Sequence, residues 1–242
     1  MNSTPKVTTL CLAMVLSSPA LALSQAMHSV TLGGPFLQVT GDARLGTHDL
    51  DVDLSVDEVL DKLELGGVLD YRLESPKWSF MAEGAFVGLG QSAHGLAMDM
   101  DITIVEADLG YRFNEYSEVF AGVRYTELTA EVAGAHPVSG DPFAIKNDDE
   151  FVDPLIGLRF ATPLSESGKW RLQGRGDIGG FGVSMNLTWQ AIVDLGYRPG
   201  EAWTFWLGYR ALSQDFDDAG KDGRFAMDVL YQGPQVGVTW AF

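Results

Sequence analysis

The chain has 242 residues, a length that suits one domain, and all-β barrels of this length are routinely single domains. A hydrophobic share of 46%, a charged share of 20% and one cysteine exclude a disordered or disulfide-dense chain, and 28 glycines suit strands joined by turns. The balance of 16 basic against 33 acidic residues, a net charge of −17, argues against nucleic acid as a partner.

Residues 1–26 are predicted to be a secretory signal peptide. Lys6 precedes an apolar run over residues 7–16, and small residues allow cleavage after Ala22 or after Ala26. The apolar run is far shorter than the roughly 20 residues that a membrane-spanning helix needs. We therefore expect a secreted chain whose mature domain covers residues 27–242.

The only cysteine, Cys11, lies inside the apolar run of this predicted signal peptide. A leucine and a threonine precede it rather than a small residue, which argues against a lipoprotein cleavage site. The mature chain would then be free of cysteine. This excludes disulfides, thiol catalysis and zinc–thiolate sites in that chain.

The segment ahead of the second predicted strand carries a helix signal at residues 55–63. Ser55 followed by Glu58 matches a capping box, and Val56, Val59 and Leu63 share one helical face with Leu60. We expect a short amphipathic helix in the first external loop. Packing as an ordinary loop helix is favoured, and a lid over the barrel mouth is the alternative.

A strict alternation of apolar and polar residues then dominates the chain. In residues 103–113, Val105, Leu109 and Tyr111 share one face, whereas Glu106 and Asp108 share the other. Residues 119–126, 170–177 and 189–198 repeat the pattern. A face that is always apolar, opposed by one that is charged or small, is typical of a barrel with lipid outside and a polar lumen. Closure also removes the unpaired edges that hydrocarbon would not tolerate.

Ten antiparallel strands are predicted. They cover residues 34–46, 64–74, 78–90, 100–113, 117–132, 149–161, 169–181, 186–198, 202–213 and 225–242. Short turns, such as residues 114–116, alternate with longer acidic links, such as 133–148 and 214–224, as expected for periplasmic turns and external loops. The apolar phase of the last strand slips, and a bulge near residues 232–234 would explain it. Eight strands are the alternative.

The chain ends in an alternating apolar strand with Val238, Trp240 and the terminal Phe242. This end resembles the C-terminal signature of bacterial outer-membrane barrels, which the barrel assembly machinery recognises. With the signal peptide and the alternation, the mature chain resembles the small barrels of the OmpA/OmpX type. The resemblance implies a Gram-negative outer-membrane location, contact with membrane lipid and lipopolysaccharide, and a monomer.

Charged residues on the polar face form the predicted lumen network. Its members are Glu106, Asp108, Arg112, Arg124, Asp153, Arg159, Arg171, Arg175, Asp177, Asp194, Arg210 and Asp228. Both signs are mixed, and the interior of so small a barrel is barely wider than its side chains. We expect Arg–carboxylate pairs to fill the lumen. A narrow passive channel is the alternative.

Signals for catalysis are weak. The histidines at 28, 48, 94 and 136 fall before the barrel or in predicted loops. None stands in a predicted strand beside a serine with an acidic partner, as nucleophilic catalysis requires. We therefore expect no catalytic residues and no cofactor.

Two acidic clusters in predicted links are weak candidates for a calcium site. They consist of Asp49, Asp51 and Asp53, and of Asp215, Asp217, Asp218 and Asp222. Calcium favours several carboxylate oxygens, but neither spacing matches a calcium-binding loop. Solvated loop charge is the favoured interpretation, and no metal is expected.

The function predicted from the sequence is a non-enzymatic barrel with acidic external loops and a structural or surface-interaction role. The narrow channel is second. A lipid-modifying enzyme is third, because some small outer-membrane barrels are enzymes of that kind.

Overall fold

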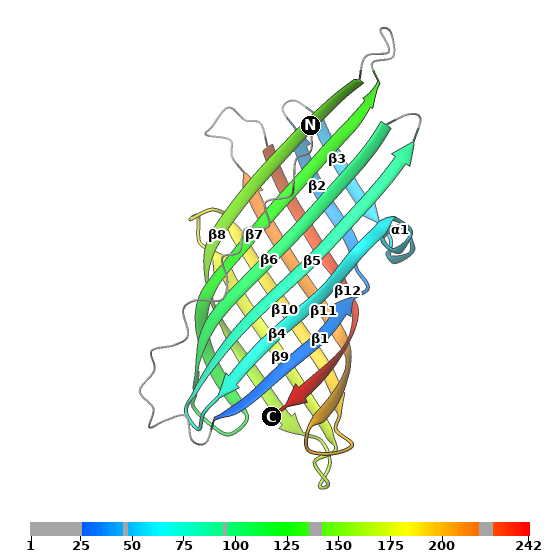
Figure 1. Cartoon of the computed structure of the whole chain (residues 1–242). Helices are drawn as coiled ribbons and strands as arrows, with labels where there is room; N and C mark the ends of the chain where they lie inside the picture. Colours follow the sequence, from blue (N-terminus) through cyan, green and yellow to red (C-terminus); the bar gives the residue numbers. More distant parts are fainter. Residues whose placement is uncertain (1–25, 46–47, 94–95, 136–141, 218–224) are drawn as a thin grey trace.

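A computed structural model describes residues 26–45, 48–93, 96–135, 142–217 and 225–242 (Figure 1). The predicted signal peptide up to residue 25, with Cys11, lies outside the described residues. The elements are β1 (Met27–Pro35), β2 (Gln38–Leu45), β3 (His48–Leu54), α1 (Val56–Lys62), β4 (Leu63–Glu74), β5 (Trp78–Ala93), β6 (Leu96–Arg112), β7 (Ser117–Ala135), β8 (Pro142–Pro163), β9 (Trp170–Gly180), β10 (Leu187–Tyr197), β11 (Trp203–Asp217) and β12 (Phe225–Ala241). Within these ranges, no helix is long and apolar enough to cross a bilayer.

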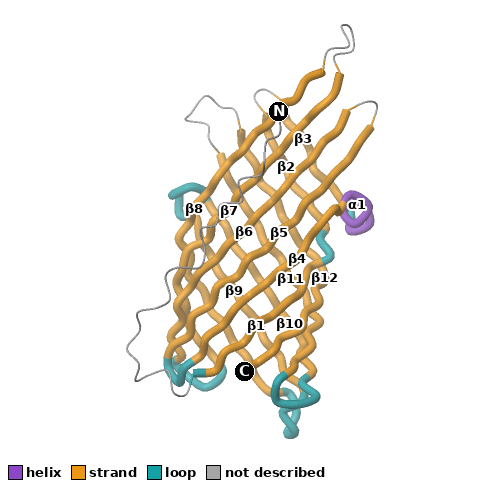
Figure 2. The backbone as a smooth tube through the Cα atoms, viewed as in Figure 1, coloured by secondary structure: helices purple, strands orange, loops and turns teal. Residues whose placement is uncertain are grey.

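The strands close into one antiparallel barrel with ten strand positions. Both β1 and β2 pair with β12 in a single register, from Ser29↔Ala241 to Leu45↔Phe225, and so form one long strand. On its other side β1 pairs with β4 and β2 pairs with β3, so β3 and β4 share the second position. Strands β5 to β12 fill the other eight, which confirms the predicted ten-stranded barrel (Figure 2).

The two faces of the wall match the predicted alternation. Leu109, Val193 and Leu207 are exposed on the outside, whereas Glu106 and Arg124 are buried inside. Aromatic residues cluster at the end of the barrel where β1 begins and β12 ends, where Trp78 packs on Tyr111, Trp170 on Tyr197 and Trp203 on Trp240. An apolar outer band that ends in an aromatic girdle is the surface of a protein in the outer membrane.

The strands at the opposite end are longer than predicted. Residues 133–135 and 142–148, expected in a loop, continue β7 and β8, and residues 214–217 continue β11. A strand needs about 9–11 residues to cross a bilayer, whereas β8 has 22. These extensions carry the hydrogen-bonded wall beyond the membrane. The short turns at the other end, including residues 114–116, are confirmed.

Strand β12 runs without the predicted bulge. Its pairing with β11 keeps one register from Trp203↔Trp240 to Asp217↔Ala226, and its pairing with β2 is equally regular. Met227, Val229 and Tyr231 are buried inside the barrel, because the upper lumen is itself apolar. The apolar residues of β12 therefore face inward near its start and outward near its end, without a bulge. For the same reason the prediction for Asp228 was wrong: it is exposed on the outer face.

The predicted helix exists, but it interrupts a strand position. The hydroxyl of Ser55 accepts the Glu58 backbone N–H, and the Glu58 carboxylate accepts the Ser55 backbone N–H, which completes the capping box. Hydrogen bonds to the Glu58 carboxylate, first from the Ser55 backbone N–H and then from the Ser55 hydroxyl, lower the pKa of Glu58. The sequence prediction missed β3, because its strand pattern is short and ends at this helix.

A charge on the lipid-facing band should weaken the barrel. In Val193→Arg the guanidinium would lie in hydrocarbon near mid-membrane, so we expect the free energy of unfolding to fall by about 2–4 kcal/mol. Urea unfolding of the barrel in lipid vesicles measures the change. Glu166→Arg, in an exposed periplasmic turn, is the control and should have no effect. Equal stability of the two variants would contradict the assigned membrane band.

Candidate functional site in the barrel lumen

Four charged side chains form a closed ring across the middle of the lumen. Arg124 on β7 donates through Nε to Glu106 Oε1 at 2.8 Å and through Nη2 to Asp177 Oδ1 at 2.7 Å. Arg175 on β9 donates to the other oxygen of each carboxylate. Each of the four side chains is 8% exposed or less. Two guanidinium groups and two carboxylates make the ring electrically neutral, which is the condition for burying charge.

A second charge cluster lies nearer the periplasmic end. Arg159 donates to both oxygens of Asp108 and, at 3.1 Å, to Glu118, which also accepts from Arg72 at 2.8 Å. Arg112 pairs with Glu74 at 2.9 Å. This cluster contains three guanidinium groups and three carboxylates, so it is also electrically neutral.

Phe120 joins the two clusters. It is 1% exposed and points inward from β7. The guanidinium carbon of Arg159 lies 3.8 Å from the centroid of its ring, and that of Arg175 lies 4.9 Å from it. Cation–π attraction is stronger where the groups are desolvated, so the ring holds both guanidinium groups in place.

Neutral polar side chains complete the central layer. Gln190 accepts from Arg210, which also pairs with Glu83, and Thr188 accepts from Arg124 at 2.9 Å. Gln214 donates to the Thr126 hydroxyl at 3.1 Å. We call the ring with Gln190, Thr188, Gln214 and Thr126 the central layer. Its neutral members are 2% exposed or less, so side chains close the cross-section.

The lumen is different on the two sides of the central layer. On the periplasmic side lies a polar vestibule of about 430 Å³, lined among others by Thr31, Arg171 and Asp194. On the external side lies a cluster of buried apolar side chains, which includes Leu212, Val229 and Met227. Polar and apolar compartments are thus stacked along the barrel axis.

The predicted lumen residues separate into several groups. Eight of the twelve form the ion pairs described above, namely Glu106, Asp108, Arg112, Arg124, Arg159, Arg175, Asp177 and Arg210. Asp194 instead accepts from the side-chain amides of Gln173 and Gln235. Arg171 lines the vestibule, without an ion pair among the described residues. Asp228 faces outward.

Asp153 is buried as predicted, but it binds backbone rather than arginine. One of its oxygens accepts the backbone N–H groups of Ser184 and Met185, both at 2.9 Å. These residues belong to the link between β9 and β10. Met185 is fully buried, so this link folds into the external mouth and is held there by the Asp153 carboxylate.

Several lumen residues were not predicted from the sequence. Glu118, Phe120 and Gln190 have the same inward parity as the predicted residues of their strands, whereas Glu83 lies on β5, where no lumen residue was predicted. Extending the two-residue period along β7 from Arg124 would have found Glu118 and Phe120. An aromatic residue on a polar face gave no signal of its own.

The histidines do not form a site among the described residues. His28 lies in β1 rather than before the barrel, where its ring bonds to the Tyr71 hydroxyl and stacks on Phe242. His48 lies in β3 rather than in a loop. The histidines at 94 and 136 lie outside the described residues.

The second acidic cluster is only partly a loop, which corrects the sequence prediction. Asp215 and Asp217 continue β11 as the external wall extends. Asp215 is half-buried, and it accepts hydrogen bonds from Asn186, at its backbone carbonyl from the backbone N–H (2.9 Å) and at its carboxylate from the side-chain amide (3.5 Å). Asp217 is exposed, whereas Asp218 and Asp222 lie outside the described residues. Asp215 therefore helps to fasten the link between β9 and β10 to β11.

The first acidic cluster lies on β3 rather than in a loop. Asp49, Asp51 and Asp53 alternate along this strand, and the last two are exposed. Within the described parts of the chain, neither this cluster nor the one at the end of β11 has the geometry of a metal site. Solvated charge stays a prediction for the exposed Asp51 and Asp53.

The C-terminal strand presents its predicted assembly residues to lipid. Trp240 and Phe242 are exposed, and Val238 has the same outward parity. Backbone bonds between His28 and Phe242 close the barrel at this end. Recognition of these residues by the assembly machinery stays a prediction.

Truncation of one ring member should destabilise the barrel strongly. Arg124→Met keeps most of the volume but leaves Glu106 and Asp177 short of a partner, so we expect a loss of about 3–5 kcal/mol in unfolding free energy. Urea titration in vesicles checks this. Lys146→Met is the control, because the Lys146–Asp148 pair at 2.9 Å is half exposed and should contribute little. A loss of unfolding free energy no larger than that of the control would contradict the stabilising role assigned to the ring.

Comparisons with known proteins support the fold. No family model matches the chain, and no curated protein matches it in sequence. The outer membrane protease OmpT of Escherichia coli is similar in structure, with a TM-score of 0.57 at 10% identity, over 90% of this chain and 97% of that one. Ail, the attachment invasion locus protein of Yersinia pestis, gives 0.42 at 14% identity over 90% and 99%. The chain is a small outer-membrane β-barrel with ten strand positions and a salt-bridged lumen.

Proposed function

We propose that the protein is a non-conducting, non-enzymatic barrel with a structural or surface-interaction role. A filled lumen makes the wall rigid, and the external end offers an acidic surface to partners. The observation that carries the proposal is the central layer, which spans the lumen with hydrogen-bonded side chains that water barely reaches. The vestibule of about 430 Å³ ends at this layer, so it supports a dead-end pocket rather than a pore.

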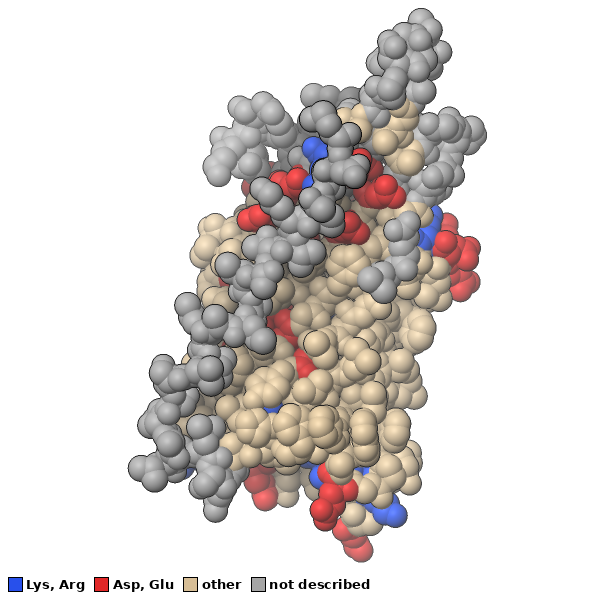
Figure 3. Space-filling model, in the orientation of Figure 1, with Lys and Arg blue, Asp and Glu red and all other residues tan. Residues whose placement is uncertain are grey.

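The acidic surface belongs to the strand extensions beyond the membrane. Figure 3 shows acidic side chains gathered at the external end, above a band that is mostly uncharged. Exposed members on β6 and β8 are Asp99, Asp101, Asp148 and Glu150. Hydrogen bonds from Lys146 and Thr129 lower the pKa of Asp148, so its carboxylate stays ionised. Such a surface favours cationic partners, including the divalent cations that accompany lipopolysaccharide.

The non-enzymatic part of the proposal is supported by the surroundings of the described titratable groups. The lumen carboxylates of the ring are saturated by guanidinium groups, and His28 is engaged by Tyr71 at the periplasmic end. Neither arrangement offers a free base beside a nucleophile. Release of fatty acid from outer-membrane lipid by the purified barrel, above a heat-unfolded control, would contradict this part.

Planar-bilayer recording tests the closed lumen. The refolded mature barrel, checked by heat-modifiable gel mobility, should insert without discrete current steps. The double variant Glu106→Ala/Arg175→Ala serves as the comparison. It removes one cation and one anion, keeps the Arg124–Asp177 pair and empties part of the layer, so we expect small discrete openings. Discrete steps from the unmodified barrel would establish the narrow channel instead.

A further inference from the structure

The wall of the barrel has a gap where α1 leaves it. Pairing joins Gly33 to Val68 below the helix and Val39 to Leu54 above it. The five residues 34–38 of the first strand position therefore correspond to the thirteen residues 55–67 of the second, and the eight in excess are Ser55 and α1. Among the described residues, no strand pairing joins residues 34–38 to 63–67, and β3 pairs with β2 alone. Figures 1 and 2 show α1 standing outside the wall at this point.

The gap opens at the depth of lipid chains. Exposed apolar side chains flank it on both sides: Leu32 and Phe36 on the first strand position, and Leu63 and Leu69 on β4. Leu60 of α1 is 43% exposed as well. The charged residues of the helix, Asp57 and Asp61 among them, are also exposed. An amphipathic helix of this kind belongs at the boundary between headgroups and hydrocarbon.

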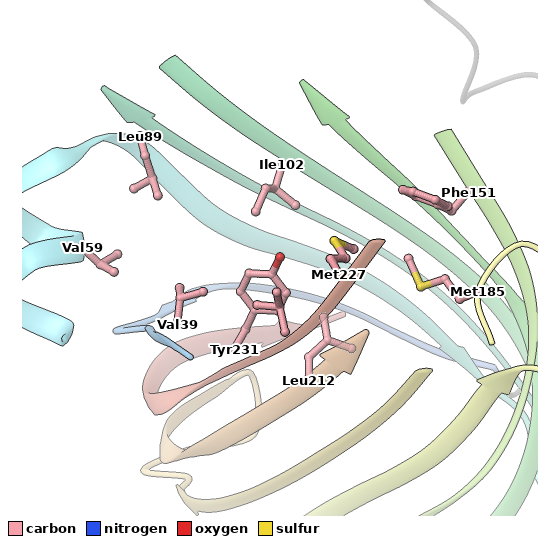
Figure 4. Packing of buried hydrophobic residues seen from close by; sticks show 10 residues of the cluster. Val39, Val59, Leu89, Ile102, Phe151, Met185, Leu212, Met227 and Tyr231 are labelled. Atoms are coloured by element: carbon pink, nitrogen blue, oxygen red, sulfur yellow. The ribbon is translucent and has the colours of Figure 1, made fainter. Parts of the chain in front are cut away.

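Behind the gap lies an apolar chamber in the upper lumen. It is a cavity of about 60 Å³, and its lining is hydrocarbon apart from Arg210, at the central layer, and Tyr231. The side chains that define it are Val39, Val59, Ala85, Leu89, Ile102 and Leu212. Figure 4 shows Val59 reaching from α1 toward Val39, with Tyr231 and Leu212 behind. A cavity with so few polar groups in its lining does not hold water well, so it favours an apolar occupant.

The side chain of Val59 closes this chamber on the side of α1. It is the one buried residue of α1 and is 3% exposed, whereas its neighbours on the helix face out. A seven-residue helix has little stability of its own, so α1 is held in the gap mainly by that side chain. Displacement of Val59 joins the chamber to the bilayer and enlarges it.

We propose that the chamber binds an alkyl chain that enters sideways from the bilayer through the gap beneath α1. Two observations point to an alkyl chain as the occupant. The flanking leucines and Phe36 put the opening in contact with lipid chains, and the lining of the chamber is hydrocarbon. The chamber lies on the external side of the central layer. The proposal therefore does not depend on whether the layer conducts ions.

Nuclear Overhauser spectroscopy tests the proposal directly. Perdeuterated mature protein with protonated methyl groups is placed in nanodiscs of dimyristoylphosphatidylcholine. We expect cross-peaks from acyl-chain protons to the methyl groups of Leu89, Ile102 and Leu212. Leu109, which is 62% exposed on the outside, is the positive control, and the fully buried methyl group of Met185 is the negative one. Cross-peaks at Leu109 but at none of the chamber residues, or equal cross-peaks at Met185, overturn the proposal.

Two matched variants exclude a general loosening of the barrel. Ala85→Leu fills the chamber and should remove the chamber cross-peaks, whereas Ala82→Leu adds the same atoms on the lipid face and should keep them. If Ala85→Leu does not fold, Leu212→Phe replaces it, with Leu89 and Ile102 as reporters. Chamber cross-peaks that survive filling overturn the proposal.

A second sample identifies the molecule that supplies the alkyl chain. Chain-deuterated phospholipid is combined with protonated dodecanoic acid. Chamber cross-peaks in this second sample assign the site to a free alkyl acid, whereas chamber cross-peaks in the first sample alone assign it to the phospholipid. The absence of chamber cross-peaks from both samples overturns the proposal.

Discussion

The structure depends on one constraint: in hydrocarbon every backbone N–H and C=O must find a partner in the protein. The chain meets it by closing its sheet, with β1 and β2 against β12 in one unbroken register. Among the described residues, the pairing is interrupted at α1, where eight residues leave the second strand position, and β3 beyond it pairs with β2 alone. The interruption lies beside exposed apolar side chains, at the external edge of the lipid-facing band.

Closure with ten strand positions also decides what the lumen can contain. The interior is only about as wide as its side chains, so charged groups there must satisfy one another. The ring of Arg124, Glu106, Arg175 and Asp177 does so with matched charge and shared oxygens. Such pairs stabilise little relative to apolar packing, but they are costly to break. The apolar upper lumen has no such requirement and leaves room for a hydrocarbon occupant.

The alternation of the sequence was enough to predict the barrel, its strand number and the inward side of most charges, because the facing of a residue repeats every two positions. It could not predict which carboxylate meets which guanidinium, since β8 separates Arg124 on β7 from Asp177 on β9 and their relative shift depends on the registers of both pairings. The rule that polar residues face inward failed at Asp228, where the upper lumen is apolar. It also gave no reason to expect Phe120 between two arginines.

The central claim is that side chains divide the lumen into separate compartments. Because the mature chain is predicted to lack cysteine, single Thr→Cys variants can report water access with a small charged thiol reagent. Thr31→Cys lies in the vestibule and Thr188→Cys in the central layer, with nearly equal side-chain volume. The account predicts rapid labelling at position 31 from the periplasmic side and none at 188. Equal labelling rates at the two positions would contradict it.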